Sequence, residues 1–479
     1  MLKNKVFYLL ILEIFLFFLL TYRLIQVPTG LTVDESAFGW NAALLSKTGH
    51  DQNGKFLPLF VSSINNSDWR QPWTQYYLTV FFKIFGISVY NLRLSSVILI
   101  LFSSILLFKF VTKLLDWRYA LVSVFLFVFT PIIFMHSHLG LDNIMPIPFA
   151  IIWLNNIYQY QLNKKDKYLI YSAIALGASF YTYKGMRAVV PIWATLSVFY
   201  VIYLNYKPKI NTIKLIKKTL PFIFAILPFF LIIPYLSHLY PGAIFGGARP
   251  KISDIYTLVY AYFSHFDLNF LFIKGDALLF HSTQKHGMML LMTAPLFFIG
   301  IYQSIRKKSF WLFITLTFFS APLLYGLVDS VYRASRIQVV VPSYVLICIL
   351  GLSTITKYKY SKIIISFLTI LTFLNLFSFL KYYWFTYPKF TENIFGNMNR
   401  NESYRVFAKE SQQRDLPHYV DSEAYEGFFD NIYFDKPSII LDHQEIPPPH
   451  SIYLSTKGDL PGFEKLDVII PDLNILLRQ

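Results

Sequence analysis

Apolar runs of about 20 residues recur along most of the chain, each long enough to cross a hydrocarbon core about 30 Å thick. Because lipid offers the backbone no hydrogen-bond partners, such runs are expected to be helices. The composition agrees: of 479 residues, 55% are hydrophobic, 19% aromatic and only 15% charged, with a mean hydropathy of +0.46. Soluble domains carry about a quarter of charged residues. The sequence therefore predicts a polytopic, all-α protein of a cell membrane.

Eleven spans are predicted from the apolar runs and from the charges between them. The short connections at one end are rich in lysine and arginine, which is typical of the cytoplasmic side. The N-terminus is then inside, and the longer segments 27–90 and 238–286 and the tail after 383 are outside. The predicted spans are 6–26, 91–112, 119–137, 143–161, 168–183, 188–206, 219–237, 287–305, 309–327, 338–356 and 361–382.

Two segments do not fit the pattern of spans. Segment 74–90 is apolar and aromatic but short, and counting it as a span would put the lysine clusters outside. We interpret it as a helix in the outer interface, with a tilted or re-entrant span as the alternative. The tail 384–479 is polar, contains three consecutive prolines and has strand-like runs at 451–455 and 466–470. It predicts a small extracytoplasmic α/β domain behind a membrane domain of residues 1–383.

The net charge of +16 does not indicate a nucleic-acid partner. The basic residues lie in the short connections between apolar runs, as is typical of the cytoplasmic loops of membrane proteins. Membrane lipid is therefore the expected environment. The single cysteine, Cys348, lies in an apolar run and has no second cysteine with which to form an internal disulfide.

The acidic pair Asp34-Glu35 follows the first predicted span, on the predicted outer side. Two carboxylates at the outer end of a membrane protein are the best candidates in this chain for a general base. The alternative is structural, because Asp34 at the start of a helix would cap backbone N–H groups.

Further ionisable residues gather at the predicted outer ends of spans, where they are costly unless they face a partner or a cavity. Lys184 and Arg187 are either snorkelling anchors or a site for an anion. Arg333 and Arg336, spaced i,i+3, are expected to be helix neighbours that hold a phosphate by bidentate contacts. A histidine pair, His136 and His138, would point to different helix faces, so no metal or other cofactor is indicated. The other outer residues of this kind are Arg70, Asp142 and His281.

Several of these segments, in this order, resemble the GT-C glycosyltransferases, in particular bacterial relatives of the protein O-mannosyltransferases and the lipid A aminoarabinose transferase. The resemblance covers about residues 5–355. In the aminoarabinose enzymes a basic residue directly precedes the proline of the first loop, whereas this chain has Gln71 there and Arg70 one step earlier. The matching segments are Val33-Asp34-Glu35-Ser36, Gln71-Pro72-Trp73, Phe85-Gly86, Arg93, Leu141-Asp142, Tyr183-Lys184-Gly185, Gly275-Asp276 with His281, and Tyr332-Arg333 through Arg336.

The resemblance implies transfer of a sugar from a polyprenyl-phosphate donor to a lipid, glycan or protein acceptor on the extracytoplasmic side. Asp34 would be the general base of a single inverting displacement, supported by Glu35 and Asp142. The donor phosphate would be held by an outer cluster of Lys184, Arg187, Arg333 and Arg336, with Arg70 and His281 as further contacts. Two alternatives remain: a flippase for lipid-linked sugars, which needs no base, and an assembly protein of the cell envelope.

Overall fold

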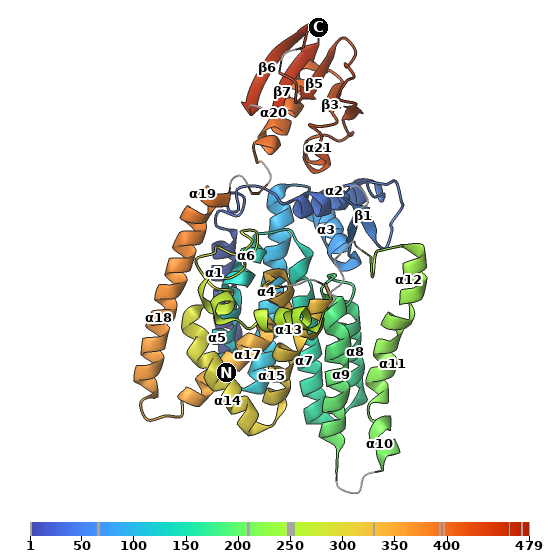
Figure 1. Ribbon diagram of the computed structural model, residues 1–479. Coiled ribbons are helices and arrows are strands. Elements are labelled where there is room, and N and C mark those ends of the chain that lie inside the picture. The colour runs from blue at the N-terminus through green and yellow to red at the C-terminus, as the bar shows by residue number, and fades with distance from the viewer. Residues whose placement is uncertain are drawn as a thin grey trace.

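The computed structural model describes residues 2–64, 68–207, 211–246, 254–328, 331–391, 394–395, 398–458, 460–470 and 473–478. A bundle of long helices forms most of the chain, and a small domain built on a β-sheet stands on one end of it (Figure 1). We call this end the α2 end, because helix α2 (Val33–Thr48) lies across it. The predicted architecture, a helical membrane protein with a small C-terminal α/β domain, is confirmed at this level.

Each of the eleven predicted spans overlaps a helix. Among the described residues, six helices are long and apolar enough to cross a membrane, or seven if the bent pair α5–α6 is one span; the number eleven stays a prediction. The helices of the spans are α1 (Leu2–Thr21), α4 (Val89–Leu114), α5 (Trp117–Val128), α6 (Pro131–Ser137), α7 (Pro146–Asn163), α8 (Asp166–Ser179), α9 (Met186–Asn205), α11 (Leu220–Leu231), α12 (Ile233–Leu239), α14 (Ala294–Lys307), α15 (Phe310–Ser320), η4 (Ala321–Val328), α16 (Ala334–Ile337), η5 (Gln338–Val340), α17 (Val341–Ile355) and α18 (Ser361–Lys381).

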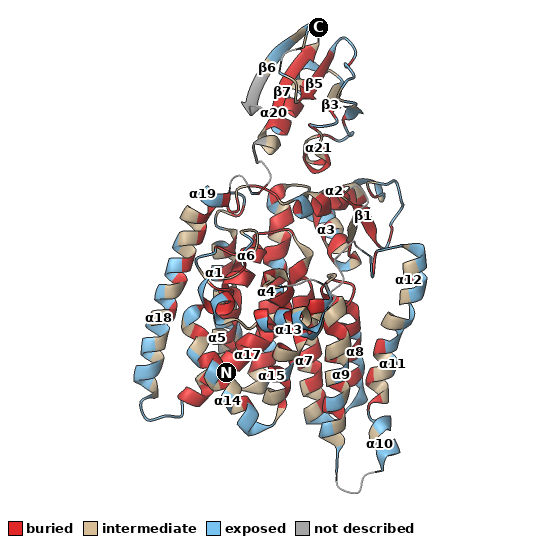
Figure 2. Cartoon of the chain, in the orientation of Figure 1, coloured by how far each residue is buried: buried red, intermediate tan, exposed pale blue. Residues whose placement is uncertain are grey.

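Burial separates the central helices from the peripheral ones (Figure 2). In the continuous helical stretch Ala334–Ile355, 89% of the most apolar window is buried, whereas in Ser361–Thr391 and in Leu220–Leu239 the share is 17%. The exposed residues of these outer helices are apolar, for example Phe367, Phe373 and Leu231. Such surfaces are stable against lipid but not against water, which agrees with an integral membrane protein.

A proline turns the chain toward the α2 end within the third predicted span. Helices α5 and α6 meet at an angle of 65°, and Pro131 is the first residue of α6. A proline is favoured at the first position of a helix because its missing N–H needs no partner there. The short helix α6, which carries the buried His136, therefore runs in a different direction from α5.

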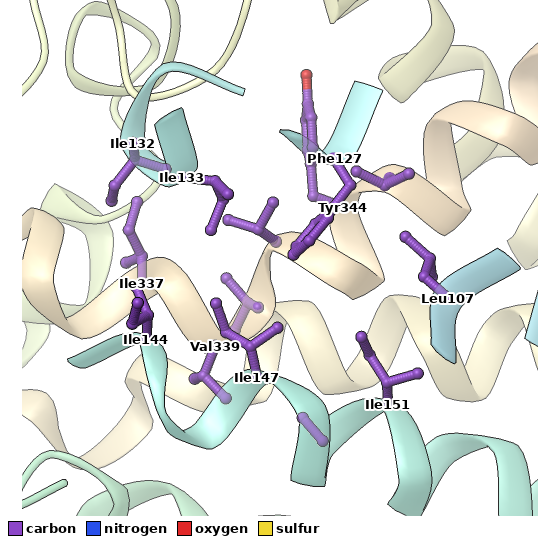
Figure 3. Close-up of a cluster of buried hydrophobic side chains, with 14 of the residues drawn as sticks. Leu107, Phe127, Ile132, Ile133, Ile144, Ile147, Ile151, Ile337, Val339 and Tyr344 are labelled. Atoms are coloured by element: carbon purple, nitrogen blue, oxygen red, sulfur yellow. The ribbon is translucent and has the colours of Figure 1, made fainter. Parts of the chain in front are cut away.

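An apolar cluster fixes the segments below the α2 end (Figure 3). It joins α6, the short helix η1 (Asp142–Ile144), α7, η5 and α17. Because well-packed interiors resist displacement, the polar residues on the same segments are held in fixed positions. The members drawn include Ile132, Ile133, Ile144, Ile147, Ile337, Val339 and Tyr344.

The first predicted outer loop folds into helix α2, a two-stranded hairpin and helix α3 (Pro72–Phe85). Strands β1 (Val61–Ser63) and β2 (Asp68–Arg70) pair antiparallel. Helix α3 has 14 residues, fewer than a span requires, and it packs beside α2 at the same end (Figure 1). This placement supports the interpretation of segment 74–90 as an interfacial helix.

The basic connections lie away from the α2 end. Helix α10 (Thr212–Lys217), which contains Lys214 and Lys217, is at the opposite end of the bundle (Figure 1). The charge asymmetry used in the sequence analysis is therefore present in space, and the sidedness itself stays a prediction. The other short elements are α13 (Ile255–Ser264), η2 (Asn269–Ile273), η3 (Leu291–Thr293), η6 (Tyr382–Thr386) and α19 (Tyr387–Thr391).

The C-terminal domain contains a five-stranded sheet in the order β4-β3-β5-β7-β6. Strand β3 pairs parallel with β4 and β5, whereas β7 pairs antiparallel with β5 and β6. Both strand-like runs read from the sequence are strands, within β5 and β6. The elements are α20 (Met398–Arg414), β3 (His418–Asp421), α21 (Gly427–Tyr433), β4 (Ile439–Leu441), β5 (Ser451–Ser455), β6 (Phe463–Ile470) and β7 (Leu473–Arg478).

The C-terminal domain contacts α2 directly through α21. The side chain of Lys47 donates hydrogen bonds to the carbonyls of Asn431 and Phe434, at 2.8 and 2.9 Å, where α21 ends. A cation at a helix C-terminus is favourable because the last carbonyls carry partial negative charge. Beside it, the rings of Phe82 and Phe428 stack with centroids 6.1 Å apart. The domain is thus attached to the helix that carries Asp34.

Two glycines permit this close contact, and substituting one of them should loosen it. A Cβ atom at Gly427 would lie 2.3 Å from the Trp40 ring, and one at Gly39 would lie 2.8 Å from the Phe428 ring. Gly427→Ala should destabilise the folded chain by about 1–3 kcal/mol, because the Trp40 ring must move. Chemical unfolding in detergent measures the change. Gly458→Ala is the control, since nothing lies within 4 Å of its Cβ; equal stability of the two variants would contradict the tight contact.

Candidate active site

Asp34 lies in the first turn of α2 with its side chain half exposed, at 54% of full accessibility. One oxygen, Oδ1, accepts a hydrogen bond of 2.8 Å from Nη1 of Arg70. No residue in the described ranges hydrogen-bonds the second oxygen, Oδ2. The N-cap of α2 is Thr32, whose hydroxyl accepts from the backbone of Glu35. The alternative that Asp34 caps the helix is therefore wrong, and its carboxylate remains accessible to a reactant.

Glu35 performs the capping role instead. Its Oε2 accepts from the Thr32 backbone N–H at 3.0 Å, which completes a capping box. Its Oε1 accepts from the Gly140 backbone at 3.0 Å and from Nε of Arg93 at 3.3 Å. Glu35 and Arg93 are both fully buried. Because both carboxylate oxygens already accept hydrogen bonds, the structure favours a positioning role for Glu35. Direct participation of Glu35 in catalysis stays a prediction that this geometry does not support.

Arg93 connects the chain before α2 to the bundle. Besides Glu35, its guanidinium donates to the carbonyls of Leu24, Pro28 and Gly30. Arg93 is on α4, whereas these carbonyls belong to the connection between α1 and α2. The buried guanidinium therefore determines where α2 begins, and with it the position of Asp34.

Charges of alternating sign continue from Asp34 into the site. Arg70 is 3% exposed, donates to the Ser63 hydroxyl at 2.7 Å, and stacks over the Phe38 ring at 4.7 Å. Its Nη1 lies 3.5 Å from Oδ2 of Asp68, and the ammonium of Lys184 donates to the other oxygen of Asp68. Burial acts to raise the pKa of Asp68, but Lys184 and Arg70 hold it below its ordinary value.

Sequence reasoning missed Asp68. A signal for it exists, since residues i and i+2 of a strand face the same side and Asp68 stands two residues before Arg70 in β2. The contact with Lys184 joins residues 116 positions apart, so no local pattern predicts it.

Arg187 and Asp142 complete this part of the site. Arg187 donates to the side-chain carbonyl of Gln71 at 2.6 Å and to the Ile244 backbone carbonyl. The uncharged Gln71 thus binds a cationic side chain that comes from α9. Asp142 is half-buried at the start of η1; burial raises its pKa to about 7, with Arg70 opposing and Asp34 and Asp68 contributing. Near neutral pH its carboxyl group can therefore donate as well as accept a hydrogen bond.

Arg333 and Arg336 were expected to be neighbours on a helix, and this is wrong. Helix α16 begins at Ala334, and Arg333 precedes it in an extended conformation. Both guanidinium groups still act electrostatically on His281. Arg336 donates to the hydroxyl of Tyr183 at 2.8 Å and lies over its ring at 5.2 Å. Tyr183 directly precedes Lys184, so Arg336 joins the same site.

An apolar cavity of about 910 Å³ adjoins these charges. Its wall begins at Pro72 and Trp73, directly after Arg70 and Gln71, and includes Tyr181. Other segments of the wall come from α3, α4, α7, α11 and α12. A largely apolar channel next to a group of cations suits an amphiphile with a charged head and a long hydrocarbon tail. The further lining residues include Tyr76, Tyr77, Phe102, Met145, Phe149, Phe229, Ile232 and Leu236.

The structure thus links the other residues proposed from the sequence through ion pairs, hydrogen bonds and electrostatic interactions, whereas Glu35 is fully buried and paired with Arg93. Asp142 is within electrostatic reach of Asp34, Asp68 and Lys184, and Arg187 is within reach of Asp142 and Arg336. His136 and His138, considered above as a possible metal-binding pair, have different partners. His136 contacts His281, whereas His138 hydrogen-bonds the Phe134 carbonyl.

The comparison with known sequences gives one family match over part of the chain. Residues 70–238 match the family model of dolichyl-phosphate-mannose-protein mannosyltransferases. The matched segment is less than half of the chain. No curated protein sequence matches.

Solved structures match over most of the chain. The crystal structure of ArnT from Cupriavidus metallidurans bound to undecaprenyl phosphate has a TM-score of 0.60 at 10% identity, over 98% of this chain and 97% of that one. Its apo form has a TM-score of 0.58 at 10% identity, over 90% and 85% of the two chains. The Archaeoglobus fulgidus oligosaccharyltransferase in complex with Zn and sulfate gives 0.51 at 11% identity, over 88% and 61%. The resemblance to GT-C glycosyltransferases is thereby confirmed, and the structural likeness extends it to the fold of almost the whole chain.

Proposed function

We propose that this integral membrane protein is a glycosyltransferase that moves a sugar from a polyprenyl-phosphate donor to an acceptor hydroxyl at the α2 end. The observation that carries the proposal is the position of Asp34. Its accessible carboxylate is ion-paired to the buried Arg70, and the residues directly after Arg70 form the wall of the apolar cavity. A base, cations and a channel for a lipid tail thus follow one another within a single site.

The proposed reaction is an in-line displacement. Asp34 accepts the proton of the acceptor hydroxyl, whose oxygen attacks the anomeric carbon of the sugar. The bond between that carbon and the phosphate oxygen breaks, and its electron pair leaves with the lipid phosphate. A base within hydrogen-bond reach accelerates such a step by about 10²–10⁴-fold. The phosphate gains negative charge as the bond breaks, so fixed cations stabilise the transition state.

The charge of the site favours an anionic ligand. Among the described residues, Asp34 pairs with Arg70, and Asp68 bridges Arg70 and Lys184. Burial keeps Asp142 partly protonated near neutral pH, so its carboxyl group carries less than a full negative charge. Among known proteins of this fold, one ArnT structure contains undecaprenyl phosphate and one oligosaccharyltransferase structure contains dolichol-phosphate. The proposed phosphate ligands are Lys184, Arg187, Arg333 and Arg336, with Arg70 and His281 as further contacts.

The proposed sidedness follows the charge of the connections. The end opposite α2 carries the lysine-rich loops, which favours a cytoplasmic location. The α2 end then faces the extracytoplasmic side, and the C-terminal domain stands there beside α2, where it would meet an incoming acceptor.

Removal of Lys184 tests the phosphate site. Lys184→Ala should weaken binding of undecaprenyl phosphate by about tenfold or more, because a charge-assisted hydrogen bond is lost and Asp68 keeps only the more distant of its two cations, Arg70. Asp68→Asn should act in the opposite direction and tighten binding, since it frees the Lys184 ammonium. Titration of the purified protein in detergent measures both. Lys214→Ala at the opposite end is the control, and unchanged affinity in both site variants would contradict the assignment.

A further inference from the structure

A buried histidine pair adjoins the arginines of the proposed phosphate site, and the displacement described above does not use it. His136 on α6 is fully buried. Its Nε2 lies 2.9 Å from Nδ1 of His281, and the two rings are nearly parallel, at 13°. Its other nitrogen, Nδ1, lies 2.8 Å from the Ile132 carbonyl. Such a chain of hydrogen bonds restricts where protons can reside.

The Ile132 carbonyl determines the positions of the protons in this chain. A carbonyl only accepts, so Nδ1 of His136 carries a hydrogen. Neutral His136 then presents a lone pair at Nε2, because an uncompensated charge at this buried position would be costly. Nδ1 of His281 must therefore donate, which leaves a lone pair on Nε2 of neutral His281. In the described part of the chain no residue hydrogen-bonds this nitrogen.

The surroundings keep His281 neutral while the site is empty. Burial lowers the pKa of His281 to about 4, and the charges of Arg333 and Arg336 contribute to this shift. The imidazole thus contacts His136 from α6 and lies within electrostatic reach of Arg333 and Arg336 from the α16 segment. Asp276, in the loop of His281, accepts from the Ala334 backbone at 2.8 Å and so ties that loop to α16. The segment that carries His281 and the segment that carries the two arginines are therefore held together.

A phosphate held by these arginines would meet the lone pair of His281. Two lone pairs repel each other, so a phosphate oxygen is accommodated only if a proton lies between it and Nε2. The negative charge of the phosphate also offsets the positive charge of the two arginines. Because this positive charge helps to keep His281 neutral, phosphate binding favours protonation of His281. We propose that His136 is a positioning residue that fixes this tautomer of His281, and that a polyprenyl phosphate monoester binds together with one proton at Nε2. The inference rests on the proposed function and deepens it.

The proton balance fits the transfer reaction. The donor is a phosphodiester with one negative charge, and cleavage of the bond to the sugar produces a monoester with two. The acceptor hydroxyl loses one proton, which passes to Asp34 and on to water. His281 takes one proton from water as the second charge appears on the phosphate. The product complex is thus formed without net release of a proton, and departure of the lipid phosphate returns the proton to solvent.

Calorimetry of undecaprenyl phosphate binding at pH 7.5 tests this coupling. Enthalpies measured in buffers of different ionisation enthalpy give the number of protons taken up. The wild-type protein should take up about one proton more than His281→Gln. The uptake that remains in His281→Gln comes from the phosphate itself, whose second pKa is about 6. Wild-type affinity should fall by up to about tenfold from pH 7 to pH 8, as uptake of one proton requires.

His136→Phe separates the relay from a merely structural role. Without an acceptor at position 136, neutral His281 can place its hydrogen on Nε2 and donate it to the phosphate. Binding should then persist within a few-fold, while proton uptake falls to the level of His281→Gln. Uptake in either variant equal to that of wild type overturns the inference, as does tight wild-type binding without uptake. If wild-type protein does not bind undecaprenyl phosphate at all, the proposed function itself fails, which is a different result.

Discussion

Replacing Asp34 with asparagine should lower sugar transfer by about 10²–10⁴-fold, the usual contribution of a general base. Asparagine keeps the shape of the side chain and can still accept a hydrogen bond from Arg70, which now bonds Oδ1. It cannot take a proton from an acceptor hydroxyl. The rate constant of transfer, measured at saturating donor with purified protein, is therefore expected to fall while donor binding stays within a few-fold.

The control is an acid at the start of another helix, far from the site. Asp116 caps α5 through the Arg118 backbone N–H, and asparagine is an equally good N-cap. Asp116→Asn should therefore transfer sugar at the parent rate. If Asp34→Asn were as active as Asp116→Asn, the base would have to be another residue, and Asp142 would be the next to test.

Removing Arg93 should have the largest effect on stability. The Glu35–Arg93 pair is fully buried, and breaking a buried pair by removing one partner costs about 3–5 kcal/mol. Arg93→Met would leave Glu35 partly unpaired, and the four carbonyls before α2 that accept from Arg93 would lose this donor. Thermal unfolding in detergent should show a large loss of stability. The double variant Arg93→Met/Glu35→Gln should recover part of it, because the buried charge is gone.

An exposed arginine serves as the comparison for Arg93. Arg414 pairs with Glu410 on the surface of α20, and exposed pairs of this kind contribute about 0.3–0.5 kcal/mol. Arg414→Met should unfold almost as the parent does. If Arg93→Met behaved like Arg414→Met, the buried pair could not be what positions the start of α2.

Much of the site could be predicted because its charges stand out against an apolar chain. Asp34, Lys184 and Arg187 interrupt hydrophobic sequence at predicted outer ends of spans, and the structure places all three in one cluster. In a membrane protein the cost of burying charge makes each such residue conspicuous. The strands at 451–455 and within 463–470 were recognisable for a similar local reason, because both are short apolar runs with β-branched residues in a polar tail.

The parts that sequence reasoning missed depend on partners far away in the chain. Nothing near Glu35 reveals that Arg93, 58 positions later, buries it, so the capping role was assigned to the wrong member of the acidic pair. The helix expected across Arg333 and Arg336 fails because Arg333 serves as the extended N-cap of α16. The contact between His136 and His281 spans 145 positions. Such pairings arise from tertiary packing, which local periodicity does not encode.

The most direct measurement is release of polyprenyl phosphate from a panel of polyprenyl-phosphate sugars, read by mass spectrometry with purified protein. We predict that the wild-type protein converts at least one donor to polyprenyl phosphate and that Asp34→Asn, with the same donor bound, loses this conversion by about two orders of magnitude or more. Conversion by Asp34→Asn at the parent rate, or binding of every donor by the wild type with no conversion of any, would contradict a glycosyltransferase that uses Asp34 as its base.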